Sequence, residues 1–295
     1  MSGMIARMTE TIGGLTGRRS RWRMDGKVVV VTGAGSGIGR ELAREAARRG
    51  ARLALSDIDV DGLAETVAMV RTDGATDVHS QRLDVTEQAM VAEYAGQVVE
   101  HFGVVNLVIN NAGIAFTGRV SQSGYKDIAR VMDVDYWGVV HGTKEFLPHL
   151  VASGDGHLAN VSSIFAILSV PTQNAYNAAK AAVQQFTESL RMEMLADGHP
   201  VDVSCVHPGG IKTAVARNAG AAEGLDSAGF ASIFDEKFAR TEASTAARVI
   251  LDGVERRRAR ILVGPDAHLI DALVRLFPSA YQRGTVAMSR RFGVL

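Results

Sequence analysis

Tyr176 and Lys180 are the two residues whose types and spacing most directly indicate chemistry. They stand four positions apart in a segment with a helical pattern, so their side chains share one face of the expected helix. A free tyrosine has a pKa near ~10, which is too high for an efficient base at neutral pH. A neighbouring ammonium group favours the phenolate, so this pair can accept and return a proton.

A second chemical signal is the glycine-rich segment at residues 32–39, which directly follows the apolar run at 28–31. Glycines allow a tight turn and a close approach of the backbone to a ligand. A pyrophosphate can then lie at the positive N-terminus of the next helix. The position of this segment, after a strand and before a helix, distinguishes it from an ordinary glycine turn.

Asp57 follows the second expected strand, where a carboxylate can accept hydrogen bonds from the two hydroxyl groups of a ribose. The same charge repels the additional phosphate of NADP, and the next residue is Ile58 rather than a cation. If a dinucleotide binds here, the sequence favours NAD. The alternative is a solvated loop carboxylate, since Asp59 and Asp61 are close by.

The elements that must position these residues alternate along the chain as short β-branched runs and longer helical patterns. Strands are expected at residues 28–31, 52–55, 78–83, 107–109, 158–161, 201–206 and 260–263. Helices are expected at residues 40–49, 60–71, 87–101, 124–150, 174–195 and 243–254. Strands joined by such helices imply right-handed crossovers and a parallel sheet.

These patterns predict an α/β fold: a single doubly wound Rossmann-type domain, with a parallel sheet of about seven strands flanked by helices. The domain is expected to span residues 25–265. Residues 1–24 are expected to form a flexible N-terminal extension, and residues 266–295 a C-terminal extension that caps the site or contacts another subunit.

Composition narrows the classes of partner and compartment. Lysine plus arginine and aspartate plus glutamate both total 32, so the formal net charge is +0 and no nucleic-acid partner is expected. Cys205 is the single cysteine; it fits a reducing compartment, and we expect an inert buried thiol. The chain lacks a run of ~18 apolar residues and a secretory signal pattern, so a cytoplasmic location is expected.

In their order and spacing, these motifs resemble the short-chain dehydrogenase/reductase family over about residues 25–265. Residues 32–39 match its T-G-x-x-x-G-x-G turn, residues 110–113 its N-N-A-G segment, and residues 176–180 its Y-x-x-x-K motif. The resemblance assigns the following residues to the cofactor: Gly33, Gly35, Ser36, Gly37, Ile38, Gly39, Asp57, Asp84, Val85, Asn111, Ala112, Gly113, Tyr176, Lys180, Pro208, Gly209, Ile211 and Thr213.

The resemblance also implies a reaction and the roles of three side chains. Tyr176 would take the proton of an alcohol as hydride leaves for the nicotinamide, or return it in the reverse reduction. Lys180 would favour the phenolate, and Ser163 would hydrogen-bond the substrate oxygen. His141, His157 and His207 show no metal-ligand spacing, and this chemistry needs no metal.

Asp135 departs from the family pattern, because it occupies the position of the catalytic asparagine three residues before a glycine. Its main-chain carbonyl can still hold a water molecule that links to the lysine. Its ionised side chain cannot donate a hydrogen bond, unlike asparagine. We expect retained activity with an altered proton relay; the alternative is a weakened enzyme.

Substrate and assembly are less specified. Apolar residues 164–168, together with Phe230, Phe234 and Phe238, favour a hydrophobic alcohol or ketone, although the phenylalanine spacing equally fits a lid helix packed on the body. The family implies a homodimer or homotetramer. The C-terminal segment 266–295 caps the active site, forms a subunit interface or touches a membrane surface.

The leading hypothesis is therefore a NAD-dependent oxidoreductase acting on a small hydrophobic secondary alcohol or ketone. One alternative within the same class is an NADP-dependent ketone reductase, against which Asp57 argues. Another, from a different class, is a dinucleotide-binding sensor without turnover. Asp135 favours that sensor, whereas Ser163, Tyr176 and Lys180 oppose it.

Overall fold

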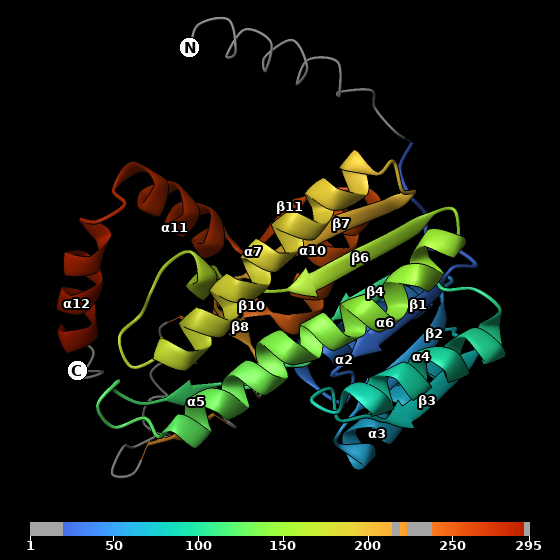
Figure 1. Cartoon of the computed structure of the whole chain (residues 1–295), viewed down its shortest axis with the longest axis horizontal. Helices are drawn as coiled ribbons and strands as arrows, with labels where there is room; N and C mark the ends of the chain where they lie inside the picture. Colours follow the sequence, from blue (N-terminus) through green and yellow to red (C-terminus); the bar gives the residue numbers. More distant parts are fainter. Residues whose placement is uncertain (1–19, 214–218, 223–237, 292–295) are drawn as a thin grey trace, which may run out of the picture.

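A parallel sheet of seven strands forms the centre of the computed structural model, which describes residues 20–213, 219–222 and 238–291 (Figure 1). The strands are β1 (Val28–Thr32), β2 (Arg52–Asp57), β3 (Val78–Arg82), β4 (Leu107–Asn110), β6 (Gly156–Val161), β7 (Val201–Pro208) and β11 (Arg260–Val263). They lie in the order β11-β7-β6-β4-β1-β2-β3, and every pairing is parallel. The predicted doubly wound fold is confirmed.

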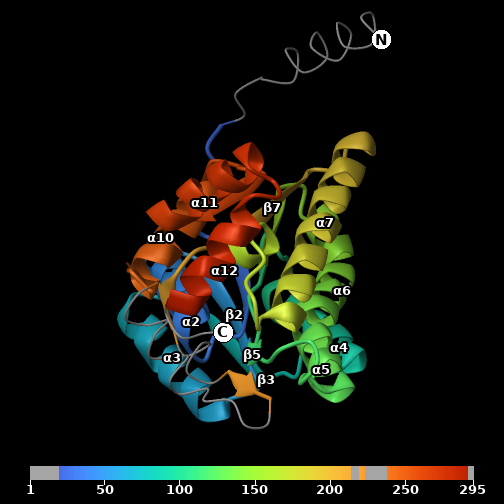
Figure 2. The ribbon, with the colours of Figure 1, turned by 90° about the vertical axis from the view of Figure 1, so that its left-hand side faces the viewer.

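Helices cover both faces of this sheet (Figure 2). They are α2 (Gly37–Arg48), α3 (Val60–Thr72), α4 (Gln88–Phe102), α5 (Tyr125–Met132), α6 (Gly138–Ala152), α7 (Asn174–Ala196), α10 (Ala243–Glu255), α11 (Pro265–Leu276) and α12 (Tyr281–Arg291). One core cluster joins α2, α3 and α10 to one face, and another joins α4, α6 and α7 to the opposite face. The strands are therefore apolar on both sides, as the fully buried β1 shows.

The order of strands in the sheet changes direction at β1, which has β2 on one side and β4 on the other. The first three strands proceed outward from β1 on one side, and β4 then pairs with β1 on its other side. Loops that follow these two strands diverge to opposite faces and leave a crevice at their carboxyl ends. The glycine-rich turn after β1 and the N-N-A-G segment after β4 both lie there.

The helix expected over residues 124–150 is interrupted in the structure. Between α5 and α6, residues Asp133–Trp137 (η1) form a π-helical turn, which inserts wider spacing into the backbone hydrogen-bond ladder. The side chain of Asp135 is placed by this turn and is fully buried. A periodicity reading could not detect the interruption, because the pattern of apolar residues continues through it.

The body of the domain begins before residue 25. Trp22 and Met24 are buried, and the Trp22 backbone N–H donates to the Glu255 carbonyl at 2.8 Å. Arg21 forms an ion pair with the side chain of Glu255, the last residue of α10. Residues 20–24, expected to belong to the loose extension, are thus ordered by an apolar anchor and by charge.

Further short elements complete the description. They are β5 (Phe116–Thr117), η2 (Ile164–Ala166), β8 (Ile211–Lys212), β9 (Gly220–Ala221) and β10 (Thr241–Glu242). The pairs β10–β8 and β5–β9 form two small separate sheets. Within the described residues, no helix is both long and apolar enough to cross a membrane.

Candidate active site

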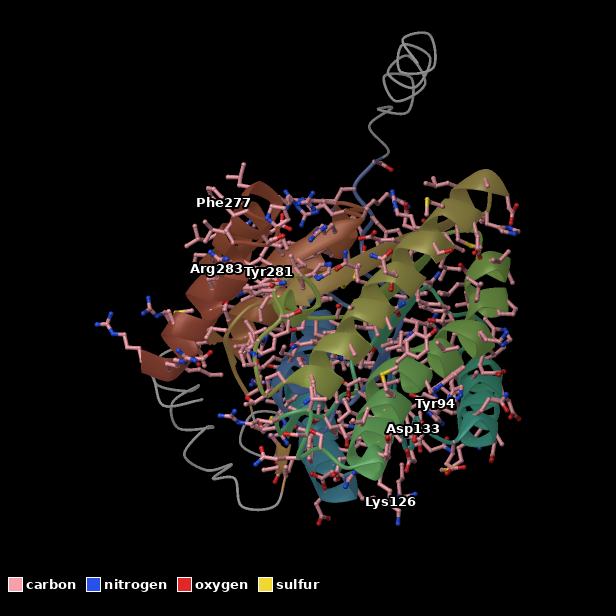
Figure 3. All side chains as sticks on the ribbon, turned by 60° about the vertical axis from the view of Figure 1, so that its left-hand side comes forward. Tyr94, Lys126, Asp133, Phe277, Tyr281 and Arg283 are labelled. Carbon is pink, nitrogen blue, oxygen red and sulfur yellow. The ribbon has the colours of Figure 1, made fainter. Side chains whose placement is uncertain are left out.

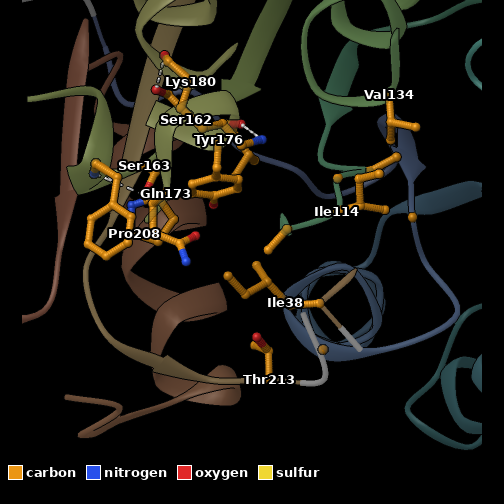
Figure 4. Close-up of a pocket in the computed structure, with 18 of the residues that line it drawn as sticks. Ile38, Ile114, Val134, Ser162, Ser163, Gln173, Tyr176, Lys180, Pro208 and Thr213 are labelled. Carbon is orange, nitrogen blue, oxygen red and sulfur yellow. Dashed lines mark hydrogen bonds between the residues drawn. The ribbon is translucent and has the colours of Figure 1, made fainter. Parts of the chain in front are cut away.

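A cavity of about 860 Å³ opens at the carboxyl ends of the central strands (Figure 4). Most of the predicted site residues line it: Gly33, Ser36, Gly37, Ile38, Asp57, Asp84, Val85, Asn111, Ala112, Gly113, Ser163, Tyr176, Lys180, Pro208, Gly209, Ile211 and Thr213. Gly35, Gly39 and Asp135 do not line it, but they contact the lining residues Asp57, Gly33 and Lys180 respectively. The sheet has thus brought residues from distant parts of the sequence to one site.

The turn after β1 is built around two glycine positions where a side chain cannot fit. Gly33 has a positive φ of 67°, and a Cβ atom there would lie 2.7 Å from the Ala112 Cα. A Cβ atom on Gly39 would lie 1.9 Å from the Gly33 carbonyl oxygen. Asn111 stabilises the turn, because its side-chain Nδ2 donates hydrogen bonds to the backbone carbonyls of Thr32 and Gly33.

Helix α2 starts at this turn and directs its N-terminus toward the cavity. Ser36, its N-cap residue, makes no side-chain capping hydrogen bond, so the hydroxyl is not committed within the helix. Both Ser36 and Gly37 line the cavity. An exposed helix N-terminus with free backbone donors is suited to bind phosphate oxygens.

The carboxylate of Asp57 is fixed at the end of β2. Its Oδ2 accepts a hydrogen bond from the Gly35 N–H at 2.7 Å, and its Oδ1 accepts one from the Asp59 N–H at 2.9 Å. Each oxygen keeps a further lone pair for a ligand hydroxyl. Arg40, a nearby cation, is engaged by Glu65 and by the Thr66 hydroxyl.

The opposite walls follow β3, β4 and β7. Asp84 accepts hydrogen bonds from the backbone and hydroxyl of Thr86, which shapes the loop that presents Val85 to the cavity. Pro208 ends β7, and the Gly210 N–H donates to Asp266 on α11 at 2.7 Å. This contact holds the segment after β7 beside the cavity.

The reactive side chains meet where α7 faces the end of β6. Tyr176 and Lys180 lie one turn apart on α7, with the Lys180 Nζ 5.6 Å from the centroid of the tyrosine ring. Ser163 caps the short helix η2, where its Oγ accepts from the Phe165 N–H at 3.1 Å. Figure 4 shows Tyr176 and Ser163 on one side of the cavity, with Ile38 and Thr213 on another.

Asp135 is joined directly to this group. Its Oδ1 accepts from the Ile114 N–H at 2.7 Å, and its Oδ2 lies 3.2 Å from the Lys180 Nζ. Lys180 also donates to the Val161 carbonyl at 3.2 Å and is itself almost fully buried. The departure from the family pattern therefore produces a buried ion pair with the lysine of the Y-x-x-x-K motif.

The pKa values of Tyr176, Asp135 and Lys180 are all raised, and in each case burial and the neighbouring charges do not all act in the same direction. Burial raises the pKa of Tyr176; the charge of Lys180 opposes that rise, and the charge of Asp135 adds to it. Burial also raises the pKa of Asp135, against the attraction of Lys180. The pKa of Lys180 is raised because Asp135 and Tyr176 together outweigh the desolvation that would lower it.

Several cavity residues were missed by sequence reasoning. Gln173 is buried, donates from Nε2 to the Thr117 hydroxyl at 2.9 Å and lines the cavity. Ile270 of α11, with Thr285, Met288 and Ser289 of α12, forms part of the wall. No local motif marks these positions. Phe238 lines the cavity, whereas Phe230 and Phe234 lie outside the described residues.

The cysteine and the buried histidines lie outside this chemistry. Burial raises the pKa of the Cys205 thiol to about 12. It lowers the pKa of His157 and of His207 to about 4, so both are neutral at neutral pH. The His207 Nδ1 lies 3.1 Å from the Ser163 carbonyl oxygen. Among the described residues, no three or more metal-binding side chains cluster to hold an ion.

Residues 27–224 match the family model described as short chain dehydrogenase. A Mycobacterium tuberculosis protein, SadH, described as an oxidoreductase, is 55% identical over 268 residues, covering 91% of this chain and 97% of the relative. The mouse dehydrogenase/reductase SDR family member 7B is 32% identical over 248 residues, covering 83% of this chain and 75% of the relative.

Solved structures show the same architecture. A short-chain dehydrogenase/reductase from Burkholderia phymatum in complex with NAD superposes with a TM-score of 0.79 at 32% identity, covering 86% of this chain and 94% of that one. An alcohol dehydrogenase from the archaeon Thermococcus sibiricus, complexed with 5-hydroxy-NADP, gives a TM-score of 0.69 at 25% identity, covering 81% and 95%.

Proposed function

The chain belongs to the short-chain dehydrogenase/reductase family, and from this premise we propose that it is a NAD-dependent oxidoreductase of hydrophobic secondary alcohols and ketones. The observation that carries the proposal is the convergence of Ser163, Tyr176 and Lys180 on the cavity that also receives the glycine-rich turn. A nicotinamide cofactor bound there supplies or accepts the hydride.

The residues around the turn fit a dinucleotide. The glycine positions leave no side chain between the turn and a ligand, and the N-terminus of α2 offers backbone donors for phosphate. Asp57 offers two carboxylate oxygens for a ribose diol and a negative charge against a 2′-phosphate. Arg40, paired with Glu65, is not free to neutralise that phosphate. These features support NAD over NADP.

In the proposed chemistry, Tyr176 holds the transferred proton on its phenolic oxygen. It donates that proton to the carbonyl oxygen in reduction and accepts it from the alcohol in oxidation. Ser163 orients the substrate oxygen by a hydrogen bond. Lys180 stabilises the charge that develops on Tyr176, and Asp135 holds Lys180 in place.

The lining of the substrate half of the cavity supports an apolar substrate. Its walls are formed by the aliphatic and aromatic side chains of Ile164, Phe165, Leu168, Val170, Ile270 and Met288. Such a lining binds hydrocarbon by burial, with few polar groups to fix orientation. A small hydrophobic alcohol or ketone is therefore the proposed partner.

Domain organisation and assembly are part of the same proposal. Residues 25–265 form the catalytic domain, to which the anchor at Trp22 adds, and residues 266–295 cap the cavity through α11 and α12. A homodimer or homotetramer and a cytoplasmic location follow from the family resemblance and from the lone buried Cys205.

The test is turnover of NAD+ with a panel of hydrophobic secondary alcohols, and of NADH with the matching ketones, followed by cofactor absorbance. Turnover with NAD+ that exceeds turnover with NADP+ supports the proposal. Faster turnover with NADP+ would favour the NADP-dependent reductase. Cofactor binding without turnover in either direction would favour the non-catalytic sensor.

A further inference from the structure

The buried ion pair between Asp135 and Lys180 changes the electrostatics around Tyr176. The Lys180 Nζ lies 5.6 Å from the centroid of the Tyr176 ring, and an isolated ammonium group at that distance would favour the phenolate strongly. Here the carboxylate lies 3.2 Å from that ammonium and offsets its charge within the same buried space. Tyr176 therefore faces a lysine–aspartate pair of no net charge rather than a lone cation.

Other groups near Tyr176 do not restore a positive field. Cys205 lies near Lys180 and stays a neutral thiol, and His207 behind Ser163 is neutral at neutral pH. Ser163 and Phe165 are the uncharged neighbours of the ring on the β6 side. The other charged residues of the cavity wall are Asp57, Asp59, Asp84, Lys126, Arg130, Asp133 and Asp266.

We propose that Asp135 is a positioning residue that offsets the charge of Lys180 and keeps Tyr176 a neutral phenol at neutral pH. This is the protonation state that ketone reduction requires, so the site is set for reduction. The inference rests on the proposed function, because it assigns a direction to the proton transfer at Tyr176. Oxidation of the alcohol then needs a higher pH to generate the phenolate.

The test is the pH dependence of alcohol oxidation in Asp135→Asn, with Asp197→Asn on the exposed end of α7 as the matched control. Removal of the carboxylate leaves Lys180 unopposed, and we expect the acidic limb of kcat/KM to move down by about 1–3 pH units. The control leaves the limb in place. Ultraviolet titration isolates the Tyr176 phenolate as the difference between each protein and the same protein carrying Tyr176→Phe. This difference should titrate at lower pH in the Asp135→Asn background than in the wild-type background, and it needs no turnover.

The outcomes separate the two claims. If Tyr176→Phe keeps full turnover, the proposed function fails. If Tyr176→Phe is inactive but Asp135→Asn moves neither the kinetic limb nor the phenolate titration, the function stands and the role of Asp135 is overturned.

A second, independent feature is an exposed apolar stripe on α11. Leu269, Leu273, Leu276 and Phe277 are 62%, 43%, 70% and 53% exposed, and their spacing places them on one face of the helix. Ile270, next to Leu269 on the same helix, lines the cavity. The stripe is therefore a continuous apolar face that no described part of this chain covers.

Exposed cations lie on the helix that follows this stripe. Helix α12 exposes Arg283, Arg290 and Arg291 and carries no acidic side chain. The acidic Asp271 of α11 is already paired with Arg260 and Arg275. Figure 3 shows Phe277 and Arg283 together at the outer end formed by the two helices.

We infer that this face of α11 and α12 docks on the surface of an anionic phospholipid bilayer. Leucines and a phenylalanine enter the headgroup boundary while arginines meet lipid phosphates, as in interfacial amphipathic helices. A second copy fits less well, because a two-fold contact would bring the α12 guanidinium groups together without carboxylate partners. The same helices wall the cavity, so an apolar substrate has a short route from the bilayer.

The test is flotation of the full-length protein with phosphatidylcholine vesicles, with and without phosphatidylglycerol. We expect binding to the anionic vesicles that weakens with salt and falls at least tenfold in Leu273→Gln/Phe277→Gln and in Arg283→Gln/Arg290→Gln. The matched control, Met192→Gln/Leu195→Gln, changes two exposed apolar residues of α7 and should bind like the wild type.

Three results would overturn this inference. They are absence of binding to anionic vesicles, retention of binding in both C-terminal variants, and a reduced oligomeric mass in those variants with no vesicle binding. The second would assign binding to the arginines of the first 24 residues. The third would assign the stripe to a contact between copies of the chain.

Discussion

The carboxylate of Asp57 accepts a hydrogen bond from the backbone N–H of Gly35 at 2.7 Å, which ties the end of β2 to the glycine-rich turn after β1. A Cβ atom on Gly35 would lie 2.8 Å from the same carboxylate oxygen, so a glycine is needed for this approach. The contact places one negative charge beside the proposed phosphate site. Cofactor preference should therefore depend on this residue.

We predict that Asp57→Ser/Ile58→Arg reverses the preference for the cofactor. The change removes the repulsion of a 2′-phosphate and adds a guanidinium group to bind it. The ratio of kcat/KM for NAD+ to that for NADP+ should fall at least tenfold. The matched control is Asp61→Ser, in the first turn of α3, which should leave the ratio unchanged.

We predict that Tyr176→Phe strongly reduces turnover while cofactor binding persists. The substitution removes only the hydroxyl that carries the transferred proton, and general acid–base catalysis contributes about 10²–10⁴-fold. Turnover should fall by that factor, with a dissociation constant for NADH, measured by fluorescence, within about threefold of the wild type. Equal loss of binding and turnover would instead indicate disruption of the pocket.

We predict that Gly39→Ala destabilises the fold and prevents cofactor binding. Its Cβ atom would lie 1.9 Å from the Gly33 carbonyl oxygen and 2.6 Å from the Asn111 Nδ2, so the turn must open. The matched control is Gly96→Ala in α4, where no heavy atom lies within 4 Å of an added Cβ. That change should raise the free energy of unfolding by up to about 1 kcal/mol. Denaturant unfolding and NADH titration measure both effects.

We predict that stability falls as pH drops below about 6.5, in part because of His157. Burial lowers its pKa to about 4 in the folded state, whereas the unfolded chain binds the proton near its ordinary pKa of 6.5. The unfolded state therefore holds more protons between these values, which costs the folded state about 1.4 kcal/mol per pH unit.

The measurement is denaturant unfolding from pH 7 to pH 4.5 in the wild type and in His157→Gln. The variant should show a shallower loss of stability over this range, whatever its stability at pH 7. His199→Gln, at an exposed position after α7, is the control and should follow the wild-type slope. A slope unchanged in His157→Gln would contradict the assignment.

The sequence by itself determined the order of strands and helices, because each is set by local periodicity. The buried run of β1, with valines on both faces, and the glycine at position 50, which follows α2 with a φ of 79°, are readable from neighbouring residues alone. The residues of the turn, of N-N-A-G and of Y-x-x-x-K were likewise readable as short motifs, and the structure gathers them at one cavity.

The contacts that these residues make with distant parts of the chain were decided only by the tertiary structure. The partner of Asp135 is Lys180 of a different helix, brought within 3.2 Å by the π-helical turn before α6. Ile270 and Met288 join the cavity wall because α11 and α12 fold back over it. Such contacts depend on how distant elements pack, and a local pattern carries no information about the distance between them.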